Sequence, residues 1–193
     1  HASSPAGVVK MSYAVGGTFT PMIEDHEKRQ EAMEWVGKAY QFHMRGEVDK
    51  AIELYNRSLE VLPTPEALTF RGWAHSFQKD YQQAIEDCHA AIDLDPEFGN
   101  PYNDIGAYYV EMDQLDDAIP WLRLALKAKR YDSYCFPQFN LGRIYEIKAD
   151  LPQALIHYKA ALLENPAYTL AIKAIERVQA QIAPLAKKGA PTS

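Results

Sequence analysis

Histidine and cysteine are the residue types in this chain most able to do chemistry, and their spacing argues against metal binding and catalysis. The histidines that fall within helix-like segments are His43, His75, His89 and His157. No two of them form the i, i+4 pair with a neighbouring carboxylate that holds zinc on a helix. The sequence has no glycine-rich phosphate loop and no Gly-x-Ser-x-Gly motif, and neither cysteine has an obvious base beside it. We therefore predict no catalytic residue, no metal ligand and no cofactor, and a protein that is not an enzyme.

The composition is that of an ordinary water-soluble domain. Of the 193 residues, 47% are hydrophobic and 24% are charged. No run of about 18 apolar residues could cross a membrane, so a membrane is not an expected partner. The net charge of −6 argues against nucleic acid, which would need a clustered basic face. Cys88 and Cys135 make no disulfide framework, which favours a reducing cytoplasmic location over the periplasm or secretion.

Four segments of the chain share one pattern of apolar and small residues. They are DKAIELYNRSLEVLP from Asp49, QQAIEDCHAAIDLDP from Gln82, DDAIPWLRLALKAKR from Asp116 and PQALIHYKAALLENP from Pro152. Their shared alanines, Ala51, Ala84, Ala118 and Ala154, lie 33, 34 and 36 residues apart. A period in this range indicates a stack of supersecondary units, and the apolar spacing within each unit predicts two helices.

A small residue recurs twelve positions before each of these alanines. It is Ala39 in the first unit and Gly72, Gly106 and Gly142 in the others. Glycine inside a helix costs about 1 kcal/mol relative to alanine, so its return at one position calls for a structural reason. We predict that neighbouring helix backbones approach closely there.

Besides the small residue and the alanine, each unit has an aromatic residue or a histidine three positions after the small residue, and three of the units close with a proline, at Pro63, Pro96 and Pro166. The repeated positions resemble tetratricopeptide repeats. The resemblance implies an all-α fold, a right-handed superhelix (solenoid) of antiparallel helix pairs. It also implies a concave face lined by the first helix of each pair, which usually holds a peptide of another protein. The expected units are repeats at 25–64, 65–98, 99–132 and 133–166, followed by a capping helix at 167–187.

The third repeat departs from the pattern. Arg130 stands where its closing proline is expected, and the next repeat starts two residues late, so the link KRYDSYC should loop out or extend a helix. Pro120 lies early in a second helix, where it allows a small kink. We also expect carboxylates such as Glu86, Asp87, Asp116 and Asp117 to lie on solvated faces.

Both ends differ from the repeats. Residues 1–10 begin with histidine and precede Met11, which suggests a vector-derived extension, with signal cleavage as the alternative. Residues 1–24 are predicted to be an extended leader, either floppy or laid on the groove through Tyr13, Val15, Phe19 and Met22. Apolar spacing at Leu170, Ile172, Ile175, Val178 and Ile182 predicts the capping helix, and residues 188–193 should form a disordered tail.

Projected onto the family geometry, the first helices place a distinct set of residues on the concave face. The binding groove is predicted to consist of Tyr40, Phe70, Trp73, Phe77, Asn103, Asp104, Phe136, Asn140 and Arg143. Further candidates facing the groove are Val36, His43, Met44, Thr69, Asn100, Ala107, Glu111 and Phe139. Large rings are the usual anchors of interaction sites, although Phe70 and Phe139 could equally belong to the core between repeats.

The groove lacks the cations that would grip the acidic tail of a chaperone. In either frame, the positions that match the family's carboxylate clamp carry no lysine or arginine, although a carboxylate needs charged donors. Asn140 matches the family's groove asparagine that bonds a peptide backbone, and Asp104 would accept an amide or a cation. We therefore predict an adaptor or co-chaperone-like module that binds a protein or peptide with apolar or aromatic residues and a basic residue. The alternative is a self-associating scaffold whose groove is filled by its own leader or by a neighbouring copy.

Overall fold

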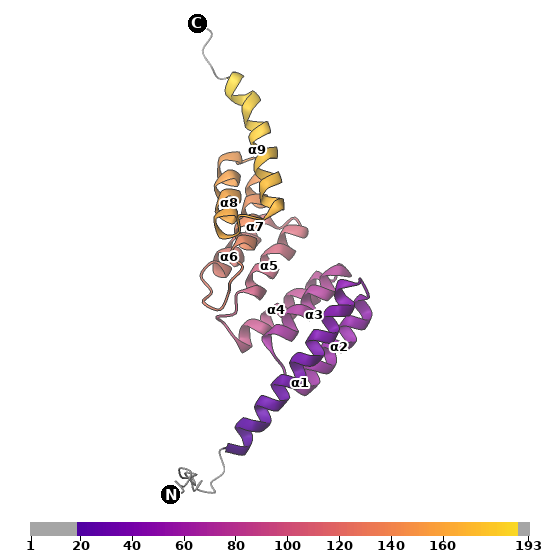
Figure 1. The fold of residues 1–193 in the computed structure, drawn as a ribbon. Coiled ribbons are helices and arrows are strands. Elements are labelled where there is room, and N and C mark those ends of the chain that lie inside the picture. Colours follow the sequence, from indigo (N-terminus) through magenta and orange to yellow (C-terminus); the bar gives the residue numbers. More distant parts are fainter. Residues whose placement is uncertain (1–18, 189–193) are drawn as a thin grey trace, which may run out of the picture.

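Nine helices run through the part of the chain that the computed structural model describes, residues 19–188, and they stack in chain order along one long axis (Figure 1). Side chains of residues 19–22, 186 and 187 are not described, and the leader residues Tyr13 and Val15 and residues 189–193 lie outside this range. The helices are α1 Phe19–Met44, α2 Val48–Val61, α3 Pro65–Phe77, α4 Tyr81–Leu94, α5 Asn100–Glu111, α6 Leu115–Ala125, α7 Cys135–Ile147, α8 Leu151–Glu164 and α9 Thr169–Lys188. Consecutive helices pack as the pairs α1–α2, α3–α4, α5–α6 and α7–α8, and α9 packs on α8. The predicted all-α solenoid of helix pairs is confirmed.

The helix ends follow local capping chemistry. Thr64 accepts a hydrogen bond from the backbone N–H of Ala67 at 3.2 Å, and Pro65 occupies the first turn of α3, where its missing N–H costs nothing. Asp80 and Asp150 cap α4 and α8 in the same way, each accepting a backbone N–H at 3.2 Å. These caps fix where the helices of each pair begin.

The turn inside each helix pair contains one residue with left-handed backbone. These residues are Gly46, Lys79, Asp113 and Ala149, with φ between 59° and 79°. They repeat in the same register as the shared alanines, so the turn geometry is part of the repeat. Only the first repeat uses glycine there, and the other three pay the small steric cost of a side chain at positive φ.

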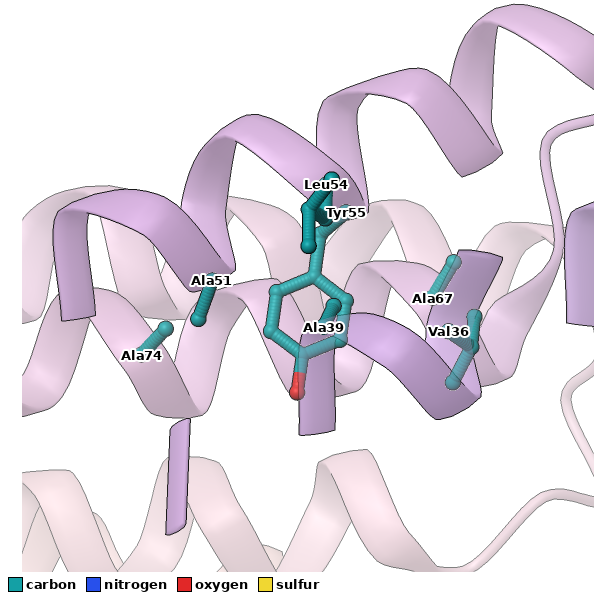
Figure 2. Close-up of a cluster of buried hydrophobic side chains, with 7 residues drawn as sticks. All are labelled: Val36, Ala39, Ala51, Leu54, Tyr55, Ala67 and Ala74. Carbon is teal, nitrogen blue, oxygen red and sulfur yellow. The ribbon is translucent and has the colours of Figure 1, made fainter. Parts of the chain in front are cut away.

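The core of the described residues is a series of small clusters, each shared by two or three neighbouring helices. Figure 2 shows the first, in which the Tyr55 ring of α2 lies among small side chains of α1 and α3. Tyr55 is fully buried, and so are the alanines Ala39, Ala51, Ala67 and Ala74 around it. Alanines of all three helices leave room for this one large ring at the point where α1, α2 and α3 meet.

The recurring glycines lie at close contacts, as predicted, and two of them lie near a backbone carbonyl of the partner helix, Ala84 for Gly72 and Ala118, at 3.4 Å from an added Cβ, for Gly106. A Cβ added at Gly72 would lie 2.8 Å from the carbonyl oxygen of Ala84. At Gly106 and Gly142 the same space is filled by the side chains of Leu122 and Tyr158. The small residue therefore admits either the partner helix or a large side chain that the partner helix carries.

The two ends of the array differ in part from the predictions. Residues 19–24 are helical, not an extended leader, because α1 begins at Phe19 and a 2.8 Å ion pair joins Glu24 to Lys28 one turn later. In α9 the buried face consists of Ala171, Ala174 and Val178. Of the five apolar positions that predicted this helix, Leu170 and Ile172 fall off this three- and four-residue spacing and are exposed.

None of the helices between residues 19 and 188 combines the length and apolarity needed to cross a membrane.

Candidate functional site

The concave face contains a groove of about 620 Å³. Its lining comes from the first helices of all four repeats and from two links: Met33, Val36, Gly37, Tyr40, Thr69, Phe70, Trp73, Phe98, Asn100, Asn103, Asp104, Tyr131 and Phe136. We call this feature the aromatic groove. Six of the nine predicted site residues line it, and Phe77, Asn140 and Arg143 do not.

One wall of the aromatic groove is a set of rings from α1 and α3 in contact with one another. The Tyr40 ring meets the Phe70 ring edge-on at 5.7 Å between centroids, and Phe70 lies 6.4 Å from Trp73. Phe70 also stacks on the buried Tyr55 at 6.1 Å, so it serves both core and groove. Because each ring is held by another, the wall presents a fixed apolar surface, and Tyr40 keeps 41% of its area exposed.

Two links that sequence reasoning did not assign to the groove supply a further part of its lining. Backbone hydrogen bonds pair the links: Arg130 N–H donates to the Glu97 carbonyl at 2.9 Å, and Gly99 N–H donates to the Arg130 carbonyl at 3.1 Å. Tyr131 fills the space where Gly99 lacks a side chain. The link after α6 therefore neither loops out nor extends a helix, and it folds back so that Phe98 and Tyr131 line the groove.

The Arg130 side chain holds this link in place through contacts with three other residues. Its guanidinium bonds the Asp95 carboxylate at 2.7 Å and the Glu66 carboxylate at 3.0 Å, and it lies 4.1 Å above the Phe98 ring. These contacts join the start of α3, the link after α4 and the link after α6. The missing proline at position 130 was the sequence signal that pointed to this segment.

The polar side of the aromatic groove consists of Asn100, Asn103 and Asp104 at the start of α5. Asp104 has one hydrogen bond, a long one of 3.4 Å from the Asn103 amide. Burial raises the pKa of Asp104 to about 7, against a small lowering by that bond. The carboxylate is thus held in a poorly solvated position without a strong partner.

Asn140 and Arg143 lie beside the aromatic groove in a chain of polar contacts. The Asn140 amide donates to Asn103 Oδ1 at 3.1 Å, and Arg143 donates to Asn140 at 3.4 Å and to Glu111 at 2.9 Å. Asn140 is 8% exposed. The protein itself therefore occupies the groups that we had predicted to bond a peptide backbone.

His43 and Phe77 belong to an aromatic cluster behind Trp73. The His43 ring lies 4.2 Å from Trp73 and 5.0 Å from Phe77, and its Nδ1 is 3.1 Å from the Tyr55 hydroxyl. Burial lowers the pKa of His43 to about 4, so the ring is neutral at physiological pH. The prediction that His43 faces the groove was wrong, because α1 turns this side chain into the core.

The other predicted candidates divide between surface and core. Phe139 packs against the rings of Tyr158 and Tyr168, at 5.4 and 5.1 Å, and so belongs to the core near α9. Met44 is 57% exposed outside the groove lining. Between residues 19 and 188 no three His, Cys, Asp or Glu side chains gather as a metal site would require.

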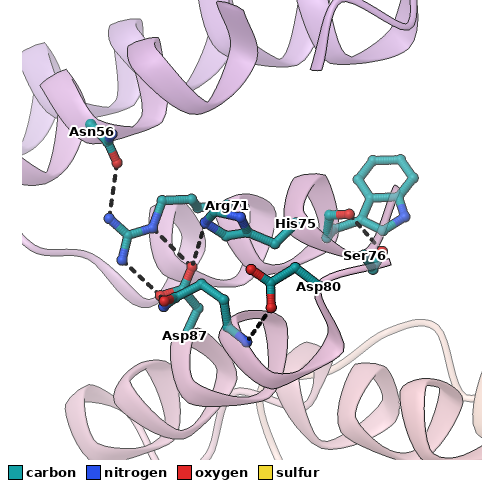
Figure 3. A network of polar contacts seen from close by, with 8 residues as sticks. Asn56, Arg71, His75, Ser76, Asp80 and Asp87 are labelled. Carbon is teal, nitrogen blue, oxygen red and sulfur yellow. Dashed lines mark hydrogen bonds and ion pairs between the residues drawn. The ribbon is translucent and has the colours of Figure 1, made fainter. Parts of the chain in front are cut away.

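An ion pair between Arg71 of α3 and the buried Asp87 of α4 joins these two helices (Figure 3). Arg71 binds Asp87 through two hydrogen bonds of 2.8 and 2.7 Å and reaches Asn56 of α2 at 2.9 Å. The Asp87 side chain is 3% exposed. The expectation that Asp87 is solvated was wrong, because it faces α3 and not water.

Sequence comparison identifies the repeats. Residues 65–98 and residues 100–132 each match a model of the tetratricopeptide repeat. The chain is a tetratricopeptide repeat protein. Relatives of this tetratricopeptide repeat protein include heat shock protein STI1 of Saccharomyces cerevisiae, 28% identical over 99 residues, which are 50% of the chain and 15% of that protein. Another is tetratricopeptide repeat protein 6 of Homo sapiens, 30% identical over 60% of the chain and 22% of that protein.

Solved structures of other proteins share the fold. PilF of Pseudomonas aeruginosa superposes with a TM-score of 0.74 at 16% identity, over 86% of this chain and 79% of that one. YrrB, described as a tetratricopeptide repeat protein with an unusual peptide-binding site, gives a TM-score of 0.56 at 20% identity, over 86% and 84%. At these identities the likeness concerns the fold alone. This tetratricopeptide repeat protein spans only 15% and 12% of the lengths of STI1 and of mouse sperm-associated antigen 1.

Proposed function

We propose that this protein is a non-enzymatic interaction module that holds a segment of a partner polypeptide in the aromatic groove. The observation that carries the proposal is the convergence of partly exposed rings from the first and fourth repeats on one volume of about 620 Å³. Tyr40 and Phe136 are 41% and 43% exposed, which is much apolar area for two rings that face a hollow. A volume of this size accommodates several side chains of a bound peptide.

The chemistry of the lining favours a segment with apolar or aromatic side chains. Trp73, Phe70 and Tyr40 offer rigid rings that bury area at little cost in side-chain entropy. The exposed Asn100 amide can bond a peptide backbone in place of Asn140, which is already engaged. YrrB, with its peptide-binding site, supports the proposal as a protein of the same fold.

Selection of peptides tests the groove directly. Short random peptides displayed on phage are selected on the immobilised protein, and the selected sequences are titrated by calorimetry. Trp73→Ala should weaken binding about tenfold or more, because a central ring in a contact is a typical hot spot. Leu163→Ala is the matched control, because Leu163 is 85% exposed on α8 and outside the groove lining, and it should leave affinity unchanged. Equal affinity for the native protein and Trp73→Ala would place the binding site elsewhere.

A second measurement separates this proposal from the self-associating scaffold that the sequence also allowed. Under our proposal, deleting residues 1–18 leaves peptide affinity unchanged, and the mass measured by sedimentation stays that of one chain. Under the scaffold alternative, the deletion frees the groove and strengthens peptide binding, or the mass rises with protein concentration.

A further inference from the structure

We propose that the aromatic groove selects partner segments that carry an arginine, whose guanidinium binds Asp104. This inference rests on the proposed function and specifies its ligand. Among the described residues that line the groove, Asp104 is the one with an ionisable acid or base of the Asp, Glu, Lys, Arg or His type. The polar side of the groove therefore carries one acidic group, next to a largely aromatic lining.

Asp104 differs from the other acidic side chains that pack within the array. The structure gives each of several such carboxylates an arginine at 2.7 to 3.0 Å: Asp87 with Arg71, Asp95 and Glu66 with Arg130, Glu111 with Arg143, and Glu146 with Arg177. Asp104 instead accepts one amide hydrogen bond of 3.4 Å. A carboxylate in a poorly solvated position that lacks a cation is an electrostatic site for a cation from outside.

The titratable groups that face Asp104 do not neutralise it. They are the Cys88 thiol of α4, the Tyr108 hydroxyl of α5 and the Tyr131 hydroxyl of the link after α6, and burial followed by the Asp104 charge raises the pKa of each. All three are neutral at physiological pH. None of them supplies a positive charge, so a cation that enters the aromatic groove would favour the ionised form of Asp104.

The rings of the groove suit a guanidinium better than an ammonium. A guanidinium stacks on aromatic faces, is more weakly hydrated and donates in a planar fork to a carboxylate. The protein already makes this arrangement once, where Arg130 lies over Phe98 and bonds Asp95. A partner arginine could repeat it between Tyr131 or Phe136 and Asp104, with spare donors directed at the Asn100 amide. A partner carboxylate would be repelled.

Parallel selections test this inference. One random peptide library is selected on the native protein and on Asp104→Asn, which keeps the shape and removes the charge. We expect arginine to be enriched in peptides from the native protein and not in those from Asp104→Asn, while aromatic and aliphatic residues are enriched in both. Binders that depend on Trp73 but show no arginine enrichment would overturn the inference and leave the proposed function standing. A library that yields no binder to the native protein would overturn both.

A change in the peptide alone repeats the test without altering the protein. In a selected peptide, the arginine is replaced by citrulline, which has nearly the same shape and no charge. Binding to the native protein should weaken about tenfold, as for the loss of a charge-assisted hydrogen bond, and binding to Asp104→Asn should hardly change. Lysine at this position should bind more weakly than arginine. Equal losses on both proteins would show that the arginine does not contact Asp104, and the inference would fail.

Discussion

Replacing Asp104 with asparagine should stabilise the unliganded protein, and the gain should grow as the pH rises. Burial raises the pKa of Asp104 from 3.8 to about 7. The folded state therefore holds this proton more tightly than the unfolded state does. Between about pH 4 and pH 7 the unfolded chain loses the proton first, so the free energy of unfolding falls as the pH rises. Asp104 thus contributes stability at low pH and costs stability at and above neutral pH.

The size of the effect follows from the shift. The rise of the Asp104 pKa from 3.8 to about 7 sets a ceiling of about 4 kcal/mol on the cost of ionising this group in the folded state. The groove is open to water on one side, which reduces the penalty, and we expect Asp104→Asn to gain about 1–2 kcal/mol near pH 8. For a chain of this size that gain raises the melting temperature by about 2–8 °C. Near pH 4 the two proteins should be nearly equal in stability.

Urea unfolding followed by circular dichroism at about pH 4, 6 and 8 measures this difference. Asp93→Asn is the control, because it removes the same charge from an exposed position on α4. The difference between the stability changes of the two variants gives the effect of burying the Asp104 charge, because both variants change the net charge equally. An Asp104→Asn protein less stable than the native protein near pH 8 would mean that Asp104 has a strong partner inside the fold. The electrostatic reasoning for a cation site would then be refuted.

Three further predictions concern the stability of the fold. Gly106→Ala should lower the free energy of unfolding in urea by about 1–3 kcal/mol, because its methyl group would overlap Leu122. Gly37→Ala, in open space, should raise it by up to about 1 kcal/mol through helix propensity. Equal changes would show that the tight contact at Gly106 does not exist. Arg71→Met should cost about 3–5 kcal/mol, because the buried Asp87 loses its arginine and keeps only a 3.3 Å hydrogen bond from Gln83 and the His75 ring at 3.9 Å. Adding Asp87→Leu should recover much of the loss in the same assay, and no recovery would mean that packing, not charge, dominates. As the pH falls from about 6.5 to about 4, the free energy of unfolding of the native protein should fall by up to about 3 kcal/mol, because the buried His43 ring stays unprotonated until its pKa of about 4. His43→Gln should not show this fall. Parallel pH profiles of the native and variant proteins would contradict a buried neutral histidine.

The repeated sequence predicted the fold well because the same physical constraint returns in every unit. Ala51, Ala84, Ala118 and Ala154 are all fully buried, as four superposable segments require. Helix periodicity and the closing prolines then determine the helix pairs, since each pair must bury one apolar face. Most of the groove lining followed from the same reasoning, because the first helix of each repeat keeps one face toward the concave side.

The errors arose where the environment of a residue depends on a segment distant in sequence. Its position in the repeat predicted that Asn140 lies on the concave side, but it did not predict the hydrogen bond to Asn103, 37 residues away. Likewise, periodicity gives the direction of His43 from the helix axis only coarsely, and a few tens of degrees separate the groove from the core. Burial by a neighbouring repeat is a tertiary property, and no single helix encodes it.

The link after α6 shows how a departure from the repeat pattern can build a site. A proline at position 130, as the pattern requires, would have no N–H to donate to the Glu97 carbonyl, a bond of 2.9 Å in the structure. It would also remove the guanidinium that holds Asp95 and Glu66 and covers Phe98. Of the two backbone bonds between the links, the one from the Gly99 N–H to the carbonyl of residue 130 would remain, and Tyr131 would be held less firmly against Gly99. The same residue that breaks the consensus therefore closes the groove on its acidic side, which explains why the residues that best distinguish this groove lie in a link and not in the repeated helices.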